Sequence, residues 1–204
     1  MQYTSKKDVE KEAYYFFNKF VRDITEVDSG HNNDIDAFRH AYASGIYTME
    51  FGDKIACLLG QFNEIKGALH SQPDAEKNMD LWNNWVGRKY GKKAKSKIEL
   101  AKLIVKALNN GELIITNDQA QDSRKYKDRN TKIIKPNKPV VVIKESSTGR
   151  NEIFLDVVTG MVMTRDDFVK LIQLGEYQGY RIARIHNILT PISKHDGSTE
   201  NNLG

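Results

Sequence analysis

The spacing of the apolar residues changes partway along this chain, and no other sequence feature constrains its fold as strongly. Between residues 9 and 108, apolar side chains recur at intervals of three and four positions, as on one face of an α-helix. Beyond Pro139 they occur in short β-rich runs separated by turn residues. The sequence therefore predicts an α+β protein, mainly a helical bundle of about five helices followed by a small β-rich α+β unit.

Polar or glycine-containing breaks delimit the predicted helices. Asp34 is expected to cap the second helix, and Ser96 with Glu99 forms a capping box at the fifth. The glycine-containing segment 109–111 ends the last of them. The predicted helices cover about residues 8–25, 34–51, 53–69, 74–90 and 96–108.

The domain organisation follows the same boundary. We expect a helical domain at residues 1–115, a linker or exposed loop at 116–136, and a small α+β unit at 137–204. The segment "DQAQDSRKYKDRNTK" within the linker is polar and has no period. In the α+β unit we expect a strand pair joined by a turn at 146–149, a short helix capped by Thr164, a last strand at 180–188 and an irregular polar tail.

Composition excludes several classes of protein. Apolar residues make up 39% of the chain and charged residues 28%, as in water-soluble globular proteins. No apolar run approaches the ~20 residues that span a bilayer, and the N-terminus lacks the apolar region of a Sec signal peptide. The single cysteine, Cys57, cannot form an internal disulfide and is expected in the core. The net charge of +4 does not by itself indicate nucleic-acid binding.

Two of the predicted helices carry short polar side chains among their aromatic residues. On the second helix, Asp36 and His40 are one turn apart and share a face. Asp36 can therefore accept a hydrogen bond from one imidazole nitrogen and leave the other as a general base. Arg39 beside them can bind a carboxylate or phosphate.

The fourth helix repeats this arrangement with Asp80 and Asn84 on one face. Adjacent asparagines, Asn83 and Asn84, are unfavourable inside a helix, so a buried network or a substrate contact is expected of them. If the second, third and fourth helices pack antiparallel, His40, Glu64 and Asp80 converge. The candidate catalytic residues are His40, Asp36, Asp80 and Glu64, and the candidate substrate-binding residues are Arg39, Asn83, Asn84 and Arg88.

Structural explanations for these residues remain open at this point. Asp36 could complement the helix dipole, and His40 could be a hydrogen-bonded core residue. Glu64 could be a solvated surface acid, and Asp80 with the asparagines could fix the helix register.

No resident metal or other cofactor is predicted. Asp36, His40, Glu64 and Asp80 could supply ligands, but the sequence has no HExxH pair and no cysteine–histidine cluster. Carboxylate and amide oxygens suit Ca²⁺ or Mg²⁺ better than zinc, so one of these ions is the alternative.

A run of basic residues joins the fourth and fifth helices. It could follow a phosphate backbone or form a solvated loop, and aromatic residues for base stacking are sparse there. The run consists of Arg88, Lys89, Lys92, Lys93, Lys95 and Lys97.

The segments "DAFRHAYASG", "LLGQFNEI" and "MDLWNNWVGRKYGKK" together resemble a group of bacterial helical domains found at the C-terminal ends of polymorphic toxins and secretion-system effectors. The group's pattern is D-A-x-R-H-A, then a helix ending in an acid, then M-D-x-x-N-N-x-x-G-R. The resemblance covers about residues 30–115. It selects Asp36, Arg39, His40, Glu64, Asp80, Asn83, Asn84, Gly87 and Arg88.

This resemblance implies an antibacterial hydrolase acting on peptidoglycan or phospholipid. In that hypothesis His40 is the base oriented by Asp36, Asp80 or Glu64 is the acid, and Asn84 with Arg39 stabilises negative charge. The arrangement is similar to the secreted phospholipase dyad, except that Ala41 stands where that family has a calcium-binding Asp and the disulfides are missing.

The toxin resemblance also implies a cognate immunity protein, a secretion-system delivery protein, and secretion without a Sec signal peptide; a cytoplasmic location is the alternative. The alternative functions are a nuclease or nucleic-acid-binding protein that uses the 88–97 run, and a non-enzymatic interaction or immunity module.

Overall fold

The computed structural model describes residues 5–25, 30–68, 74–116, 126, 138–197 and 203, with only the backbone described at 62–68. The chain divides into two compact units, Met1–Arg129 and Asn130–Gly204. The first unit is a helical bundle and the second a small β-rich unit with one described helix, so the predicted fold class is confirmed. Apart from Thr116 and Tyr126, the predicted linker lies outside the described residues.

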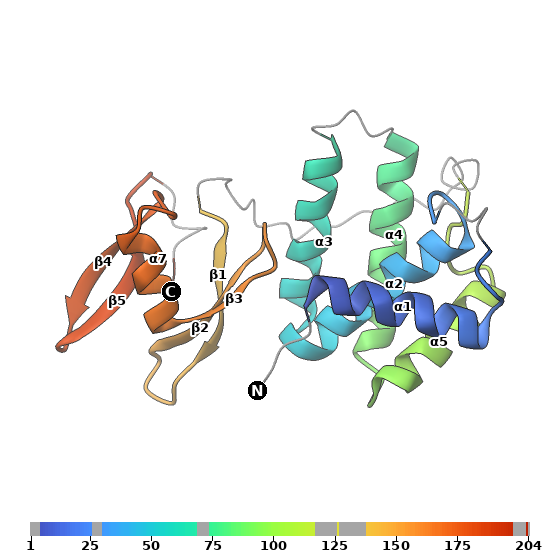
Figure 1. The fold of residues 1–204 in the computed structure, drawn as a ribbon, viewed down its shortest axis with the longest axis horizontal. Helices are drawn as coiled ribbons and strands as arrows, with labels where there is room; N and C mark the ends of the chain where they lie inside the picture. Colours follow the sequence, from blue (N-terminus) through green and yellow to red (C-terminus); the bar gives the residue numbers. More distant parts are fainter. Residues whose placement is uncertain are drawn as a thin grey trace. The chain divides into compact units, whose positions relative to one another are not determined.

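Each predicted helix is present (Figure 1). The first ends earlier than predicted, at Phe20, where the side-chain oxygen of Asn18 accepts a hydrogen bond of 2.6 Å from the backbone N–H of Ile24. The N-cap of the second is Asn33 rather than the predicted Asp34, because the Asn33 side chain accepts from the N–H of Asp36. The helices are α1 (Lys6–Phe20), α2 (Asp34–Phe51), α3 (Asp53–Ala68), α4 (Asp74–Gly91) and α5 (Lys97–Asn109).

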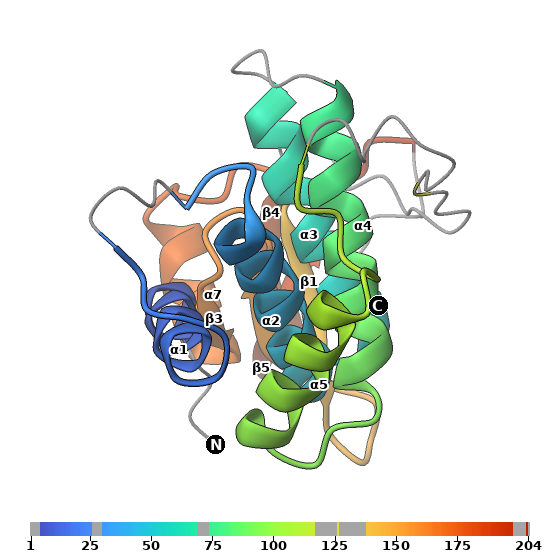
Figure 2. The same ribbon diagram turned by 90° about the vertical axis from the view of Figure 1, so that its right-hand side faces the viewer.

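Helix α2 is the centre of the first unit and contacts α1, α3, α4 and α5. Figure 2 shows it between α1 and the pair formed by α4 and α5. Its aromatic residues Phe38 and Tyr42 are fully buried and lie against Phe17 and Phe16 of α1. Because α2 is surrounded in this way, any polar side chain on it is partly or fully removed from water.

Glycines bring α2 and α4 into backbone contact. A Cβ atom on Gly87 would overlap the carbonyl oxygen of Ala41, and one on Gly91 would lie 2.5 Å from the carbonyl oxygen of Gly45. Residue numbers rise together at these two contacts, so the helices run in the same direction. Any side chain larger than hydrogen at Gly87 would force the helices apart.

The second unit holds two antiparallel sheets. The first has the order β1 (Val140–Glu145), β2 (Asn151–Asp156), β3 (Val162–Thr164). Thr164 and Asp167 form a capping box at the start of α7 (Arg165–Gln173). The second sheet pairs β4 (Tyr180–Ile185) with β5 (Ile188–Ser193). The core of the unit includes Phe154, Phe168 and Tyr180.

The prediction of one last strand at 180–188 followed by an irregular tail was wrong. The chain turns at His186 and Asn187, which have φ angles of 49° and 63°, and returns as β5. Two central residues with positive φ match the right-handed twist of a hairpin and allow this tight reversal. Within the described residues, β4 and β5 form a sheet of two strands, so Pro191 lies in an edge strand, where the missing N–H of proline is tolerated.

Candidate functional site

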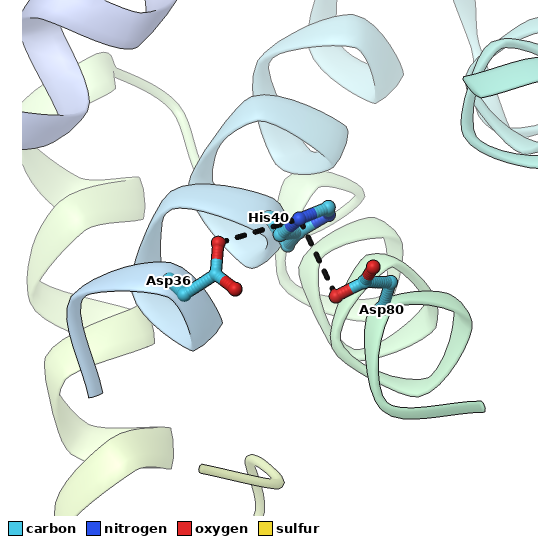
Figure 3. A group of neighbouring side chains, drawn as sticks. All are labelled: Asp36, His40 and Asp80. Carbon is cyan, nitrogen blue, oxygen red and sulfur yellow. Dashed lines mark ion pairs between the residues drawn. The ribbon is translucent and has the colours of Figure 1, made fainter. Parts of the chain in front are cut away.

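Two carboxylates and an imidazole from α2 and α4 meet at one place (Figure 3). His40 Nε2 lies 3.5 Å from Asp36 Oδ1 and 3.4 Å from Asp80 Oδ1. One ligand-type atom from each residue lies within 4.8 Å of the others. We refer to Asp36, His40 and Asp80 as the DHD cluster.

The DHD cluster is largely buried but not sealed. The exposed fraction of the side chain is 3% for Asp36, 8% for Asp80 and 20% for His40. Burial of ionisable groups is unfavourable unless each is paired, so their meeting requires compensating contacts. The imidazole is the member that water or a ligand can reach most readily.

Asp36 is held by groups from its own helix and from the turn before it. Its Oδ2 accepts a hydrogen bond of 2.9 Å from the backbone N–H of Asn32, and its Oδ1 accepts one from Arg39 Nη2. Burial alone would lower the pKa of Arg39, but the charge of Asp36 and its hydrogen bond raise it overall. The negative charge of Asp36 is thus balanced by Arg39, and the carboxylate is oriented before any ligand binds.

One imidazole nitrogen faces both carboxylates. The two contacts of Nε2 are longer than the ~2.7–3.2 Å of an ordinary N–H···O hydrogen bond. The sequence predicts a dyad in which Asp36 accepts a hydrogen bond from one imidazole nitrogen of His40 and the other nitrogen acts as a base. In the structure Asp80 contacts the same nitrogen as Asp36, so the geometry is that of two oxygens and one nitrogen around a common point.

Asn83 fastens the chain after α5 to α4. Its amide donates a bond of 2.8 Å to the carbonyl oxygen of Ile114 and accepts one of 2.9 Å from the N–H of the same residue. Both residues are fully buried. These paired bonds give Asn83 a structural role, in line with the buried network that is one of the two alternatives expected of it.

Arg88 and Asn84 are also engaged in packing. Arg88 is buried, lies 3.3 Å from Asp53 and donates a bond of 2.8 Å to the hydroxyl of Tyr126, so its guanidinium has partners within the chain. Asn84 is buried against Gly60, where an added Cβ would lie 3.1 Å from its amide nitrogen. The side chain of Glu64, which is predicted to belong to the site, lies outside the described part of the chain.

Acidic side chains lie beside four of the six residues of the basic run, with Arg88 and Lys92 sharing Asp53. Lys92 lies 2.8 Å from Asp53, Lys89 lies 3.0 Å from Glu112 and Lys97 lies 2.6 Å from Glu12. With Arg88 also paired, less positive charge is available to a phosphate backbone than the sequence alone indicates.

Sequence reasoning missed Asn32, whose backbone N–H binds Asp36. Asn32 has a φ of 50°, a left-handed conformation that asparagine adopts more readily than most residues. The available signal was the pair of asparagines directly before the helix, in "HNND".

The chain belongs to the family described as a domain of unknown function (DUF6973), whose profile matches residues 3–112. This span holds α1 to α5 and therefore every member of the DHD cluster. No solved structure matches the chain. Within the described residues, none of the helices combines the length and apolar character needed to cross a membrane.

Proposed function

We propose that this protein is a hydrolase whose catalytic centre is the DHD cluster and whose substrate is a component of the bacterial cell envelope. The observation that carries the proposal is the meeting of His40 with carboxylates from two different helices at a partly exposed position. Hydrolysis needs a group that activates water and charges that respond to the transition state, and this trio can supply both.

A purely structural role explains the DHD cluster less well. Removing two carboxylates from water carries a desolvation penalty of several kcal/mol per ion, and the side chains of Asp36 and Asp80 are only 3% and 8% exposed. The contact between α2 and α4 is already made by the glycines and the apolar core. A costly polar group that the packing does not require is typical of a functional site.

The envelope substrate is supported by the resemblance to toxin and effector domains, not by geometry. Peptidoglycan and phospholipid both contain bonds that an activated water could hydrolyse. The same resemblance supports delivery by a secretion system and neutralisation by an immunity protein.

The alternative functions have weaker support. Pairing of Arg88, Lys89, Lys92 and Lys97 with acids reduces the support for a nucleic-acid-binding surface. A nucleic-acid binder would also lose affinity steeply as salt rises. A non-enzymatic interaction module would keep its activity when the DHD cluster is removed.

The test is growth of a bacterial host that expresses the full chain with or without an added periplasmic signal sequence. Wild type is compared with His40→Ala and with His195→Ala, a matched control at an exposed histidine in the second unit. We expect growth inhibition in the periplasm only, lost in His40→Ala and retained in His195→Ala. Inhibition only in the cytoplasm would overturn the envelope substrate, and equal inhibition by His40→Ala at equal expression would overturn the catalytic role.

A further inference from the structure

We propose that Asp36, His40 and Asp80 together bind one zinc ion, with one ligand atom from each side chain. The binding site follows from the geometry of the DHD cluster alone. The role given to the ion, activation of water for hydrolysis, rests on the proposed function. The sequence predicts no resident metal, with Ca²⁺ or Mg²⁺ as the alternative, whereas the structure favours zinc.

The separations between the ligand atoms fit a zinc coordination sphere. A tetrahedral site with ligand bonds of ~2.1 Å places its ligand atoms ~3.4 Å apart. The two separations from His40 Nε2 are 3.5 and 3.4 Å. The two carboxylate oxygens lie at most 4.8 Å apart. Side-chain rotations that bring them closer by up to ~1.4 Å would complete the coordination sphere.

The orientation of His40 favours a shared cation over a hydrogen-bonded dyad. An imidazole nitrogen offers a single N–H or a single lone pair. One N–H would bond best to one carboxylate at a short distance, yet Nε2 lies almost equally far from Asp36 and Asp80. A lone pair directed toward an ion between the two oxygens accounts for this arrangement.

The donor types select among divalent ions. Zinc is bound by imidazole nitrogen and carboxylate oxygen, whereas Ca²⁺ and Mg²⁺ prefer oxygen ligands alone. Three protein ligands leave the fourth tetrahedral position for water, as in catalytic zinc sites. The 20% exposed fraction of the His40 side chain gives water a route to that position.

Charge and second-sphere contacts agree with this assignment. Asp36 and Asp80 each place a carboxylate oxygen beside His40 Nε2, and two carboxylates at one position attract a divalent cation. Asp36 is oriented by Arg39 and by the N–H of Asn32, as carboxylate ligands of zinc are oriented by outer-sphere hydrogen bonds. A zinc ion there would lower the pKa of its bound water toward neutrality and supply the nucleophile of the proposed hydrolase.

The experiment uses the purified full chain without a polyhistidine tag, stripped of metal by chelator and dialysed. Isothermal titration calorimetry and thermal unfolding are measured with Zn²⁺, Mn²⁺, Ca²⁺ and Mg²⁺. We expect one zinc ion per chain with a Kd in the micromolar range or tighter, a rise in Tm, and at least tenfold weaker binding of Ca²⁺ and Mg²⁺. Absence of zinc binding by the folded chain, or a preference for Ca²⁺, would overturn the inference.

Variants locate the site. Asp80→Asn and His40→Ala should each weaken zinc binding at least a hundredfold with unchanged far-ultraviolet circular dichroism, while His195→Ala binds as wild type. If a cluster variant fails to fold, nitrogen NMR of histidine-labelled wild type replaces it. Of the five histidines in the chain, the ring of His40 should then shift on zinc addition, and a shift of the others alone would contradict the site.

Failure of this inference and failure of the proposed function can be told apart. Zinc binding at the DHD cluster without toxicity in either compartment would support the metal site and overturn the proposed hydrolase function. Toxicity that depends on His40 in a chain that binds no zinc would support the proposed hydrolase function and overturn the metal site.

Discussion

The backbone of Gly87 on α4 lies against the carbonyl oxygen of Ala41 on α2, with no room for a side chain between them. Ala41 directly follows His40, and Gly87 lies two turns after Asp80 on the same helix. The distance between the two helices at this contact therefore sets the distance between imidazole and carboxylate in the DHD cluster.

Replacement of Gly87 by alanine should separate the helices. We expect Gly87→Ala to lower the free energy of unfolding by about 3 kcal/mol, because the methyl group meets backbone that cannot rotate away. Chemical denaturation followed by circular dichroism measures this loss. The control is Lys11→Ala on the exposed face of α1, which should change stability by less than about 0.5 kcal/mol. Equal effects of the two substitutions would contradict the close approach of α2 and α4.

Asn83 provides a test of a structural role against a substrate-binding one. Asn83→Ala removes both hydrogen bonds to Ile114 and leaves that backbone buried without them, so we expect a loss of about 2–4 kcal/mol in unfolding free energy. Zinc affinity of the folded fraction should stay within a factor of three of wild type. Asn109→Ala at the exposed end of α5 is the control. Unchanged stability with lost activity would restore the substrate-binding interpretation.

The free energy of unfolding at acidic pH should depend on the protonation of Glu112. Burial acts to raise the pKa of Glu112, but hydrogen bonds from Tyr90 and Lys89, of 2.7 and 3.0 Å, lower it overall. A carboxyl whose pKa is lowered on folding stabilises the protein above its unfolded pKa of ~4.3, and this stabilisation is lost as pH falls through the folded value.

Glu112→Gln should therefore destabilise the chain by about 0.5–1 kcal/mol at pH 7, a modest figure because the side chain is 31% exposed. The difference from wild type should shrink as pH falls below the unfolded pKa of the carboxyl and through its lower folded pKa. Urea denaturation at several pH values measures both. A difference that grows toward low pH would mean that the pKa of Glu112 is raised instead.

Sequence patterns predicted the structural features that depend on residues close together in the chain. The bounds of α2 and α4 follow from local periodicity and from the breaks that flank them, and Asp36 and His40 share a face because a helix repeats every 3.6 residues. The β4–β5 hairpin was missed for an equally local reason. Its turn residues, His186 and Asn187, include no glycine, so the usual signal for a two-residue turn is weak.

Contacts between distant segments could not be read in the same way. The approach of Asp80 to His40 was predicted only on the condition that the helices pack suitably, and it depends on the glycine contacts between α2 and α4. The bonds of Asn83 to Ile114 and of Arg88 to Tyr126 join residues far apart in the chain. A polar residue bound to such a partner has the same sequence pattern as one that faces a substrate.

The substitution His40→Ala distinguishes most directly between a catalytic and a purely structural role of the DHD cluster. Its contacts with Asp36 and Asp80 are longer than ordinary hydrogen bonds, so in the metal-free chain His40→Ala should change unfolding free energy by less than about 1 kcal/mol. The same substitution should abolish both periplasmic toxicity and the rise in Tm that zinc causes in wild type. Asn83→Ala serves as the opposite control, with a large loss of stability and an intact zinc response. If His40→Ala instead destabilised the metal-free chain as much as Asn83→Ala and left toxicity in place, the DHD cluster would be a structural network.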